Sequence, residues 1–225
     1  MSKFVVQGIA GNLATAALFL ACIFIPAGTV HYWQAWAFFA AFEAAAQSIG
    51  VYFLVHDRSV LERRMAFGPQ AEKELVQKLI STLIVTAFLL MLIFPALDHR
   101  YGWSPVPAYV SVLADILVAL SLLANIPVLK ANRYAASTIR VEEGQPIAST
   151  GPYAWVRHPM YAAAIALFVS IPLALGSWRG VLGLAPVLLL LAWRLLNEER
   201  FLRQNLPGYV EYTHKVRYRL VPLVW

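Results

Sequence analysis

Long apolar runs alternate with shorter polar segments along the 225 residues of the chain. Most runs approach the roughly 20 residues that an α-helix needs to cross a bilayer. The pattern therefore predicts an all-α fold, a polytopic membrane bundle of about six transmembrane helices. The predicted helices cover roughly residues 8–27, 32–55, 76–97, 106–128, 159–176 and 180–197.

The composition agrees with a membrane protein. Hydrophobic residues make up 60% of the chain and charged residues 13%, whereas soluble domains average about 45–50% and 25%. The net charge of +6 could suggest a nucleic-acid partner, but the basic residues fall between the apolar runs and form no basic stripe. No nucleic-acid partner is therefore predicted. No obligate protein partner is indicated, and membrane lipids are the expected surroundings. No metal site is predicted, because no metal-ligand spacing joins His31, His56, His99 and His214.

The distribution of Lys and Arg predicts an orientation. With the N-terminus in the cytosol, the parts that face the cytosol are Lys3, residues 57–78, residues 129–157 and the chain beyond residue 193. These parts carry all but two of the 18 Lys and Arg, the exceptions being Arg100 and Arg179. Because cytosolic loops are enriched in Lys and Arg, both termini are predicted to be cytosolic. The chain length and the short loops favour a multi-pass protein of a bacterial inner membrane.

The last two predicted helices are joined by the short turn GSWRG, residues 176–180. So short a connection makes them an antiparallel helical hairpin. The tail that follows, ERFLRQNLPGYVEYTHKVRYRLVPLVW, is amphipathic and basic. It is predicted to lie on the membrane surface at the cytosolic side.

The stretch GPYAWVRHPMY, residues 151–161, precedes the fifth predicted helix. Proline suits the first position of a helix and pushes the residue before it out of helical geometry, so the helix is predicted to begin at Pro159, with Arg157 and His158 at its mouth. A helix N-terminus can seat a carboxylate or a phosphate. The stretch also fits a plain helix start in which Arg157 meets lipid headgroups and the aromatic residues form an interface belt.

A second polar cluster, WRLLNEERFL at residues 193–202, lies where the sixth predicted helix leaves the membrane. Arg194 and Glu198 are four residues apart and share one helical face, within reach of each other. Glu199 points about 100° away, and a helix-end ion pair with snorkelling would also explain the pattern. Since the hairpin makes this cluster a neighbour of residues 151–161, the two are predicted to form one pocket open to the cytosol.

Together these motifs resemble a known family. GPYAWVRHPMY, then RLLNEERFL about 35 residues on, then LPGYVEYTHKV, are similar to the C-terminal region of the isoprenylcysteine carboxyl methyltransferases and the related phospholipid methyltransferases. The resemblance covers about residues 130–225. Two departures stand out: Ala163 occupies a position where the family often has Gly, and LPGYVEY lacks the usual acidic pair.

The resemblance implies one integral membrane domain, residues 1–225, that uses S-adenosylmethionine and releases S-adenosylhomocysteine. Residues 1–128 would hold four N-terminal spans, and residues 129–225 the catalytic region with a cofactor loop, the hairpin and the tail. The residues implied at the cofactor are Gln145, Pro146, Ile147, Ala148, Tyr153, His158, Pro159, Met160 and Tyr161. Those implied in catalysis at the methyl acceptor are Arg194 and Glu198, with Glu199 as a further candidate base.

The acceptor is expected to be lipophilic, and several readings stay open. A carboxylate of isoprenylcysteine type needs no base and could bind Arg194 in a bidentate manner. The amino headgroup of a phospholipid would lose a proton, for which Glu198 or Glu199 is the nearest base. The ending YRLVPLVW also resembles NADPH-dependent membrane sterol reductases, and a transporter or scaffold is the non-enzymatic alternative.

Other polar residues are predicted to be structural. Glu43 and Asp115 lie in the middle of spans, where an unpaired acid is costly. Gln47 and Ser111, each one helical turn away, are their expected hydrogen-bond partners. DRSVLERR, residues 57–64, is predicted to be a solvated cytosolic loop.

Overall fold

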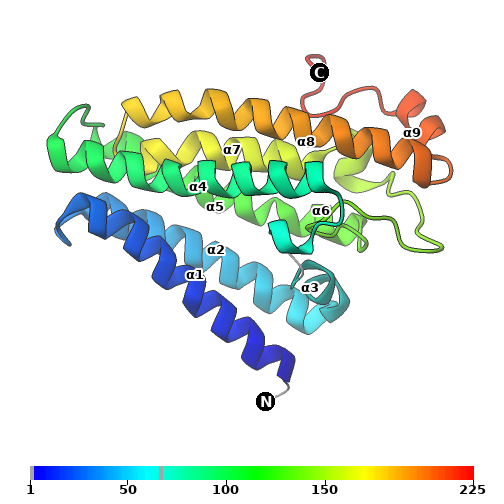
Figure 1. The fold of residues 1–225 in the computed structure, drawn as a ribbon, viewed down its shortest axis with the longest axis horizontal. Helices are drawn as coiled ribbons and strands as arrows, with labels where there is room; N and C mark the ends of the chain where they lie inside the picture. The colour runs from blue at the N-terminus through cyan, green and yellow to red at the C-terminus, as the bar shows by residue number, and fades with distance from the viewer. Residues whose placement is uncertain (1–2, 66–67) are drawn as a thin grey trace.

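The computed structural model describes residues 3–65 and 68–225; positions 66 and 67 of the predicted 57–78 loop, and residues 1–2 of the chain, lie outside the described residues. Helices account for nearly all regular structure (Figure 1). The helices are α1 (Lys3–Ala27), α2 (Trp33–His56), α3 (Arg58–Met65), η1 (Pro69–Ala71), α4 (Leu75–Tyr101), α5 (Ala108–Leu123), α6 (Asn125–Ala131), η2 (Gly151–Ala154), α7 (Pro159–Ala174), η3 (Arg179–Gly183), α8 (Leu184–Asn205) and α9 (Tyr209–Lys215).

The predicted all-α membrane bundle is confirmed. Five helical stretches are long and apolar enough to cross a membrane: Phe4–Ala27, Trp33–His56, Leu75–Tyr101, Ala108–Ala131 and Arg179–Asn205. The fifth predicted span, α7, is a shorter apolar helix. It begins at Pro159 with His158 as its N-cap residue, as the proline predicts. Within residues 3–65 and 68–225, extended structure is limited to one isolated bridge between Pro105 and Ser177.

The bundle has two parts (Figure 1). α4, α5, α7 and α8 run side by side, and the pair α1 and α2 packs obliquely against them. One apolar core joins the two parts, because the buried faces of these helices meet. Its fully buried members include Ile23, Phe38, Leu92, Val118, Ile171, Leu175 and Val187.

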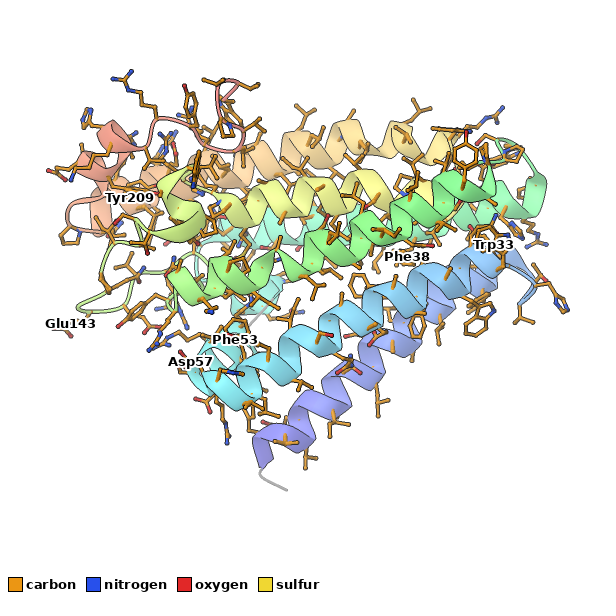
Figure 2. The ribbon with its side chains drawn as sticks, turned by 180° about the vertical axis from the view of Figure 1, so that it is seen from behind. Trp33, Phe38, Phe53, Asp57, Glu143 and Tyr209 are labelled. Atoms are coloured by element: carbon orange, nitrogen blue, oxygen red, sulfur yellow. The ribbon has the colours of Figure 1, made fainter. Side chains whose placement is uncertain are left out.

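The polar segments gather at one end of the bundle. α3, α6 and α9 lie together at that end (Figure 1), and Asp57, Glu143 and Tyr209 lie there, opposite Trp33 (Figure 2). This agrees with the expectation that both polar loops and the tail share one side. That this side is the cytosol stays a prediction.

The hairpin turn at the opposite end is closely packed. The Asp98 carboxylate accepts hydrogen bonds from the hydroxyls of Ser104 and Ser177 and, at 2.7 Å, from the backbone N–H of Ser104. Ser177 Oγ in turn accepts the N–H of Gly180 at 2.9 Å. A Cβ at Gly180 would lie 2.7 Å from Pro172 Cβ, so only glycine fits where α7 and α8 are joined.

The structure tests the hydrogen bonds predicted for the two acidic residues in the middle of spans, Glu43 and Asp115. Glu43 accepts hydrogen bonds from Gln47 and Asn12, both at 3.1 Å, which confirms its predicted role within the bundle. The expected Asp115–Ser111 bond is wrong, because the Ser111 hydroxyl donates to the carbonyl of Leu173 at 3.0 Å.

The predicted solvated loop 57–64 is also corrected. Arg58 to Met65 form helix α3, whose Val60 is buried. Arg63 pairs with Glu142 at 3.3 Å, so one face of α3 packs on the segment that follows α6 and only the other face is solvated.

We expect Gly180→Ala to lower the free energy of unfolding by about 1–3 kcal/mol, since the new methyl group meets two rigid proline rings. Thermal unfolding in detergent would measure the change. Gly183→Ala is the matched control, because its Cβ would meet only Met91 Cγ, at an ordinary 3.8 Å. Equal unfolding temperatures for the two variants would contradict the tight packing of the turn.

Candidate functional site

The buried carboxylate of Glu199 holds the polar end together. Its Oε1 accepts hydrogen bonds from Arg157 Nε at 2.7 Å and His158 Nε2 at 3.3 Å, and its Oε2 accepts one from Arg219 Nε at 2.9 Å. The side chains of Arg157, His158 and Glu199 are each about 95% buried. One acidic residue of α8 thus joins the start of α7 to the C-terminal tail.

Backbone contacts extend this junction. The N–H groups of Arg157 and His158 donate to the carbonyls of Tyr218 and Arg219, both at 2.9 Å. Arg157 Nη1 donates to the carbonyls of Val216 and Arg217 at 2.9 and 2.8 Å. The tail therefore runs alongside Arg157 and His158 and holds these residues in place before α7 begins.

The tail is amphipathic as predicted, but its apolar face packs on the protein. Leu206, Tyr209, Tyr212 and Val216 form a buried cluster against Ile147. That the tail lies on the membrane surface stays a prediction, but this apolar face is covered by protein and not by lipid. The reason is that the segment after α6 supplies an apolar partner that hydropathy could not place.

Gly208 permits this docking. It has a φ of +80° at the start of α9, and a Cβ there would lie 3.0 Å from Ile147 Cδ1. Tyr212 Oη then donates to the carbonyl of Tyr153 at 2.8 Å. Burial raises the pKa of Tyr153 to about 12, so its phenol stays neutral beside Asn132, which donates to it at 3.4 Å.

A cavity of about 450 Å³ lies beneath the tail and within the helix ends. Its walls come from α3, α4, α5, α6, the segment after α6, η2, α7, α8 and α9. Ten of the predicted site residues line it: Gln145, Pro146, Ile147, Ala148, Tyr153, His158, Met160, Tyr161, Arg194 and Glu198. Ala163, the departure from the family pattern, lines it too, whereas Pro159 and Glu199 do not.

The two motifs meet in this cavity, as the hairpin predicts. Tyr161 Oη donates a hydrogen bond of 2.6 Å to Glu198 Oε2, across the interface of α7 and α8. Glu198 and Glu199 are adjacent on α8 and point to different places, since Glu198 faces the cavity and Glu199 faces Arg157. The Glu198 carboxylate is therefore accessible from the cavity, whereas the Glu199 carboxylate is bound to arginine side chains of the protein.

Arg194 pairs with an acid that the sequence did not indicate. Its Nη2 donates to Glu72 Oε1 at 2.6 Å and to the Ser137 carbonyl at 3.1 Å, while Nη1 donates to Ser81 Oγ at 2.8 Å. Glu198 had been the expected partner. Glu72 is the partner instead, because it lies between η1 and the N-terminus of α4, where the Glu72 carboxylate is buried beside Arg194.

Several residues of the cavity wall were not foreseen. The main ones are Arg64, Ser81, Ser121, Asn132, Tyr209 and Tyr212. The sequence held one usable signal, because a buried arginine such as Arg194 requires an acid and the 57–78 segment offers several. Nothing in the spacing selects Glu72 among them.

Comparison with known proteins identifies one family. The family model described as phospholipid methyltransferase matches residues 109–207. This range runs from the start of α5 to just past the end of α8 and includes both motifs. A comparison with curated proteins gives no significant match.

Glu199→Gln is expected to destabilise the junction by about 3–5 kcal/mol, because it leaves the buried Arg157 without a carboxylate. Trypsin cleavage at Lys215 and Arg217 should accelerate, and the unfolding temperature should fall. Glu62→Gln is the control, since the exposed Arg58–Glu62 pair is worth about 0.3–0.5 kcal/mol. Cleavage at the wild-type rate in Glu199→Gln would refute the anchoring role.

Proposed function

Because residues 109–207 belong to the phospholipid methyltransferase family, whose members are integral membrane enzymes that use S-adenosylmethionine, we propose that this methyltransferase modifies a lipid acceptor in the cavity at the polar end of its bundle. One observation carries the proposal. The residues around the start of α7 and the Arg194–Glu198 face of α8 line the same cavity and are joined by the Tyr161–Glu198 hydrogen bond.

The cavity fits the cofactor. Its volume lies within the roughly 300–1,000 Å³ of typical small-molecule sites. Two lining groups, Ser121 Oγ and Tyr209 Oη, are buried without a hydrogen-bond partner among the described residues, as expected for groups that bind a polar ligand. S-adenosylmethionine supplies an electrophilic methyl group on a sulfonium.

Three wall segments make up the proposed cofactor half. They are residues 145–148, Tyr153, and the group of His158, Met160 and Tyr161, all of which line the cavity. Pro159 acts indirectly, since by starting α7 it sets the direction of Met160 and Tyr161. The docked tail covers part of the cavity through Leu206, Tyr209 and Tyr212, which strengthens electrostatic interactions there by excluding some water.

The first acceptor candidate is a carboxylate of isoprenylcysteine type, which would be O-methylated without a base. The Arg194 guanidinium has five N–H donors, and protein acceptors occupy both of its Nη groups. Its Nε has no acceptor among the described residues, so a carboxylate would approach along Nε while Glu72 holds the guanidinium in place.

The second candidate is the amino headgroup of a phospholipid, and Glu198 favours it. Within the described part of the chain, Glu198 has no cation within ion-pair distance and accepts only the Tyr161 hydroxyl. A carboxylate at the cavity wall can hold an ammonium group and take its proton. Glu199 is not suited to this role, because two arginines and His158 already engage it.

The apolar part of the cavity wall suits a lipid chain. Ile84 and Val85 of α4, Leu167 of α7 and Leu191 of α8 line it between the polar end and the middle of the bundle. The proposal takes residues 1–225 as one integral membrane domain, with both termini and the cavity on the cytosolic side of a bacterial inner membrane. In this proposal, residues of the catalytic region, 129–225, and residues of the N-terminal region, 1–128, line the same cavity.

Ligand binding tests the proposal directly. Titration calorimetry of the purified protein in detergent should give binding of S-adenosylhomocysteine and none of NADPH. Ala163→Leu should weaken the binding of S-adenosylhomocysteine at least tenfold, because the larger side chain projects into the cavity. Binding of NADPH alone would contradict the proposal and favour the reductase alternative.

A methylation assay separates the two acceptors. N-acetyl-S-farnesylcysteine and vesicles of phosphatidylethanolamine are each supplied with labelled S-adenosylmethionine. If the amine is the acceptor, Glu198→Gln should lower kcat by about 10²–10⁴-fold, because the base is lost. If the carboxylate is the acceptor, Glu198→Gln should act weakly and Arg194→Gln should raise KM. Glu62→Gln is the control, and methylation of neither lipid would overturn both candidates.

A further inference from the structure

Four arginines line the cavity, and all but one of them pair with a carboxylate. Three arginines have a carboxylate nearby: Arg140 with Glu142 at 3.3 Å, Arg157 with Glu199 at 2.7 Å and Arg194 with Glu72 at 2.6 Å. Arg64 is the exception, because within residues 3–65 and 68–225 no carboxylate lies within ion-pair distance of it. Among the described residues, the cavity thus presents Arg64 as an unpaired cation and Glu198 as an unpaired carboxylate.

The contacts that Arg64 does make are weak. Its Nη1 lies 3.4 Å from the carbonyl of Ala135 and 3.5 Å from Met160 Sδ. Nε and Nη2, which carry three of the five guanidinium N–H groups, have no acceptor among the described residues. Burial lowers the pKa of Arg64, yet an arginine keeps its charge in proteins, so the desolvated cation lacks a counter-charge.

The same helix pairs its other arginines. Arg58 bonds to Glu62 at 2.9 Å and Arg63 to Glu142 at 3.3 Å, so acids are available around α3. Only the arginine that turns into the cavity lacks one. This arrangement is expected where the missing anion belongs to a ligand.

The position of Arg64 indicates where that anion binds. Its contact with Met160 Sδ places the guanidinium beside the first turn of α7. At this turn Pro159 has no N–H, and the Tyr161 N–H donates to the His158 carbonyl at 3.1 Å, so the Met160 N–H is left without an acceptor among the described residues. The partial positive charge of a helix N-terminus attracts an anion. An oxyanion between Arg64 and this turn would receive hydrogen bonds from both.

We propose that Arg64 is the anion-binding residue of the cavity and holds a carboxylate or phosphate of a bound ligand against the N-terminus of α7. The inference rests on the proposed function, in which two ligands carry such a group: the amino-acid end of S-adenosylmethionine and the lipid acceptor. Arg64 lies outside residues 109–207, so the family match does not assign it this role.

The first experimental arm compares two cofactor fragments by titration calorimetry. S-adenosylhomocysteine carries the amino-acid carboxylate, whereas 5′-methylthioadenosine keeps the nucleoside and the thioether without it. Arg64→Gln should weaken S-adenosylhomocysteine roughly tenfold to a hundredfold, the range for a hydrogen bond to a charged group, and leave 5′-methylthioadenosine unchanged. Arg64→Lys should fall between, since it keeps the charge without the planar fork. Arg58→Gln is the matched control and should change neither affinity.

The second arm tests the acceptor as the source of the anion. If S-adenosylhomocysteine binds Arg64→Gln as tightly as wild type, KM for phosphatidylethanolamine vesicles or N-acetyl-S-farnesylcysteine should rise by a similar factor. The inference is overturned if neither affinity nor KM changes. It is also overturned if both cofactor fragments weaken equally, because that indicates a changed cavity shape.

These outcomes separate the inference from the proposed function. A wild-type protein that binds neither cofactor fragment overturns the proposed function and this inference together. Unchanged cofactor binding together with an unchanged KM for both lipids across the Arg64 variants overturns the inference alone. Thermal unfolding of each variant shows that it is folded, and Arg64→Lys carries the test if Arg64→Gln is not.

Discussion

The polar end of this protein depends on one buried carboxylate. Glu199 accepts hydrogen bonds from Arg157, His158 and Arg219, which come from the start of α7 and from the tail. Because the side chains of Arg157 and Glu199 are both buried, leaving the Arg157 guanidinium without its carboxylate would be costly. The carboxylate therefore fixes the start of α7 and the tail relative to α8, and all three contribute residues to the cavity wall.

The sequence was sufficient for features that local patterns encode. Apolar runs of membrane length predicted the spans, and Pro159 predicted the start of α7. The short GSWRG turn predicted that the two motifs would meet, as the Tyr161–Glu198 hydrogen bond confirms. These predictions succeed because each depends on residues close together in sequence or on a forced neighbour relation.

The features that could not be predicted from the sequence are contacts between distant residues, for which several residues were equally suitable partners. Arg194 and Glu72 are 122 positions apart, and the polar 57–78 segment offers other acids that composition cannot distinguish from Glu72. The amphipathic tail likewise presented an apolar face without indicating whether lipid or Ile147 would cover it. The first was decided by packing between the two halves of the chain, which brings Glu72 to Arg194 and Arg64 to the cavity wall, and the second by packing within residues 129–225.

Because Glu198 and Glu199 are adjacent on α8, the contacts of Glu199 also determine the orientation of Glu198. Successive residues of a helix point about 100° apart, so the three bonds that hold Glu199 also fix the rotation of α8 about its own axis. That rotation in turn decides where the Glu198 carboxylate points. The tail therefore determines the direction of the Glu198 carboxylate through Glu199. By holding one face of α8, it keeps the cavity-facing side of the helix in a fixed orientation toward a bound ligand.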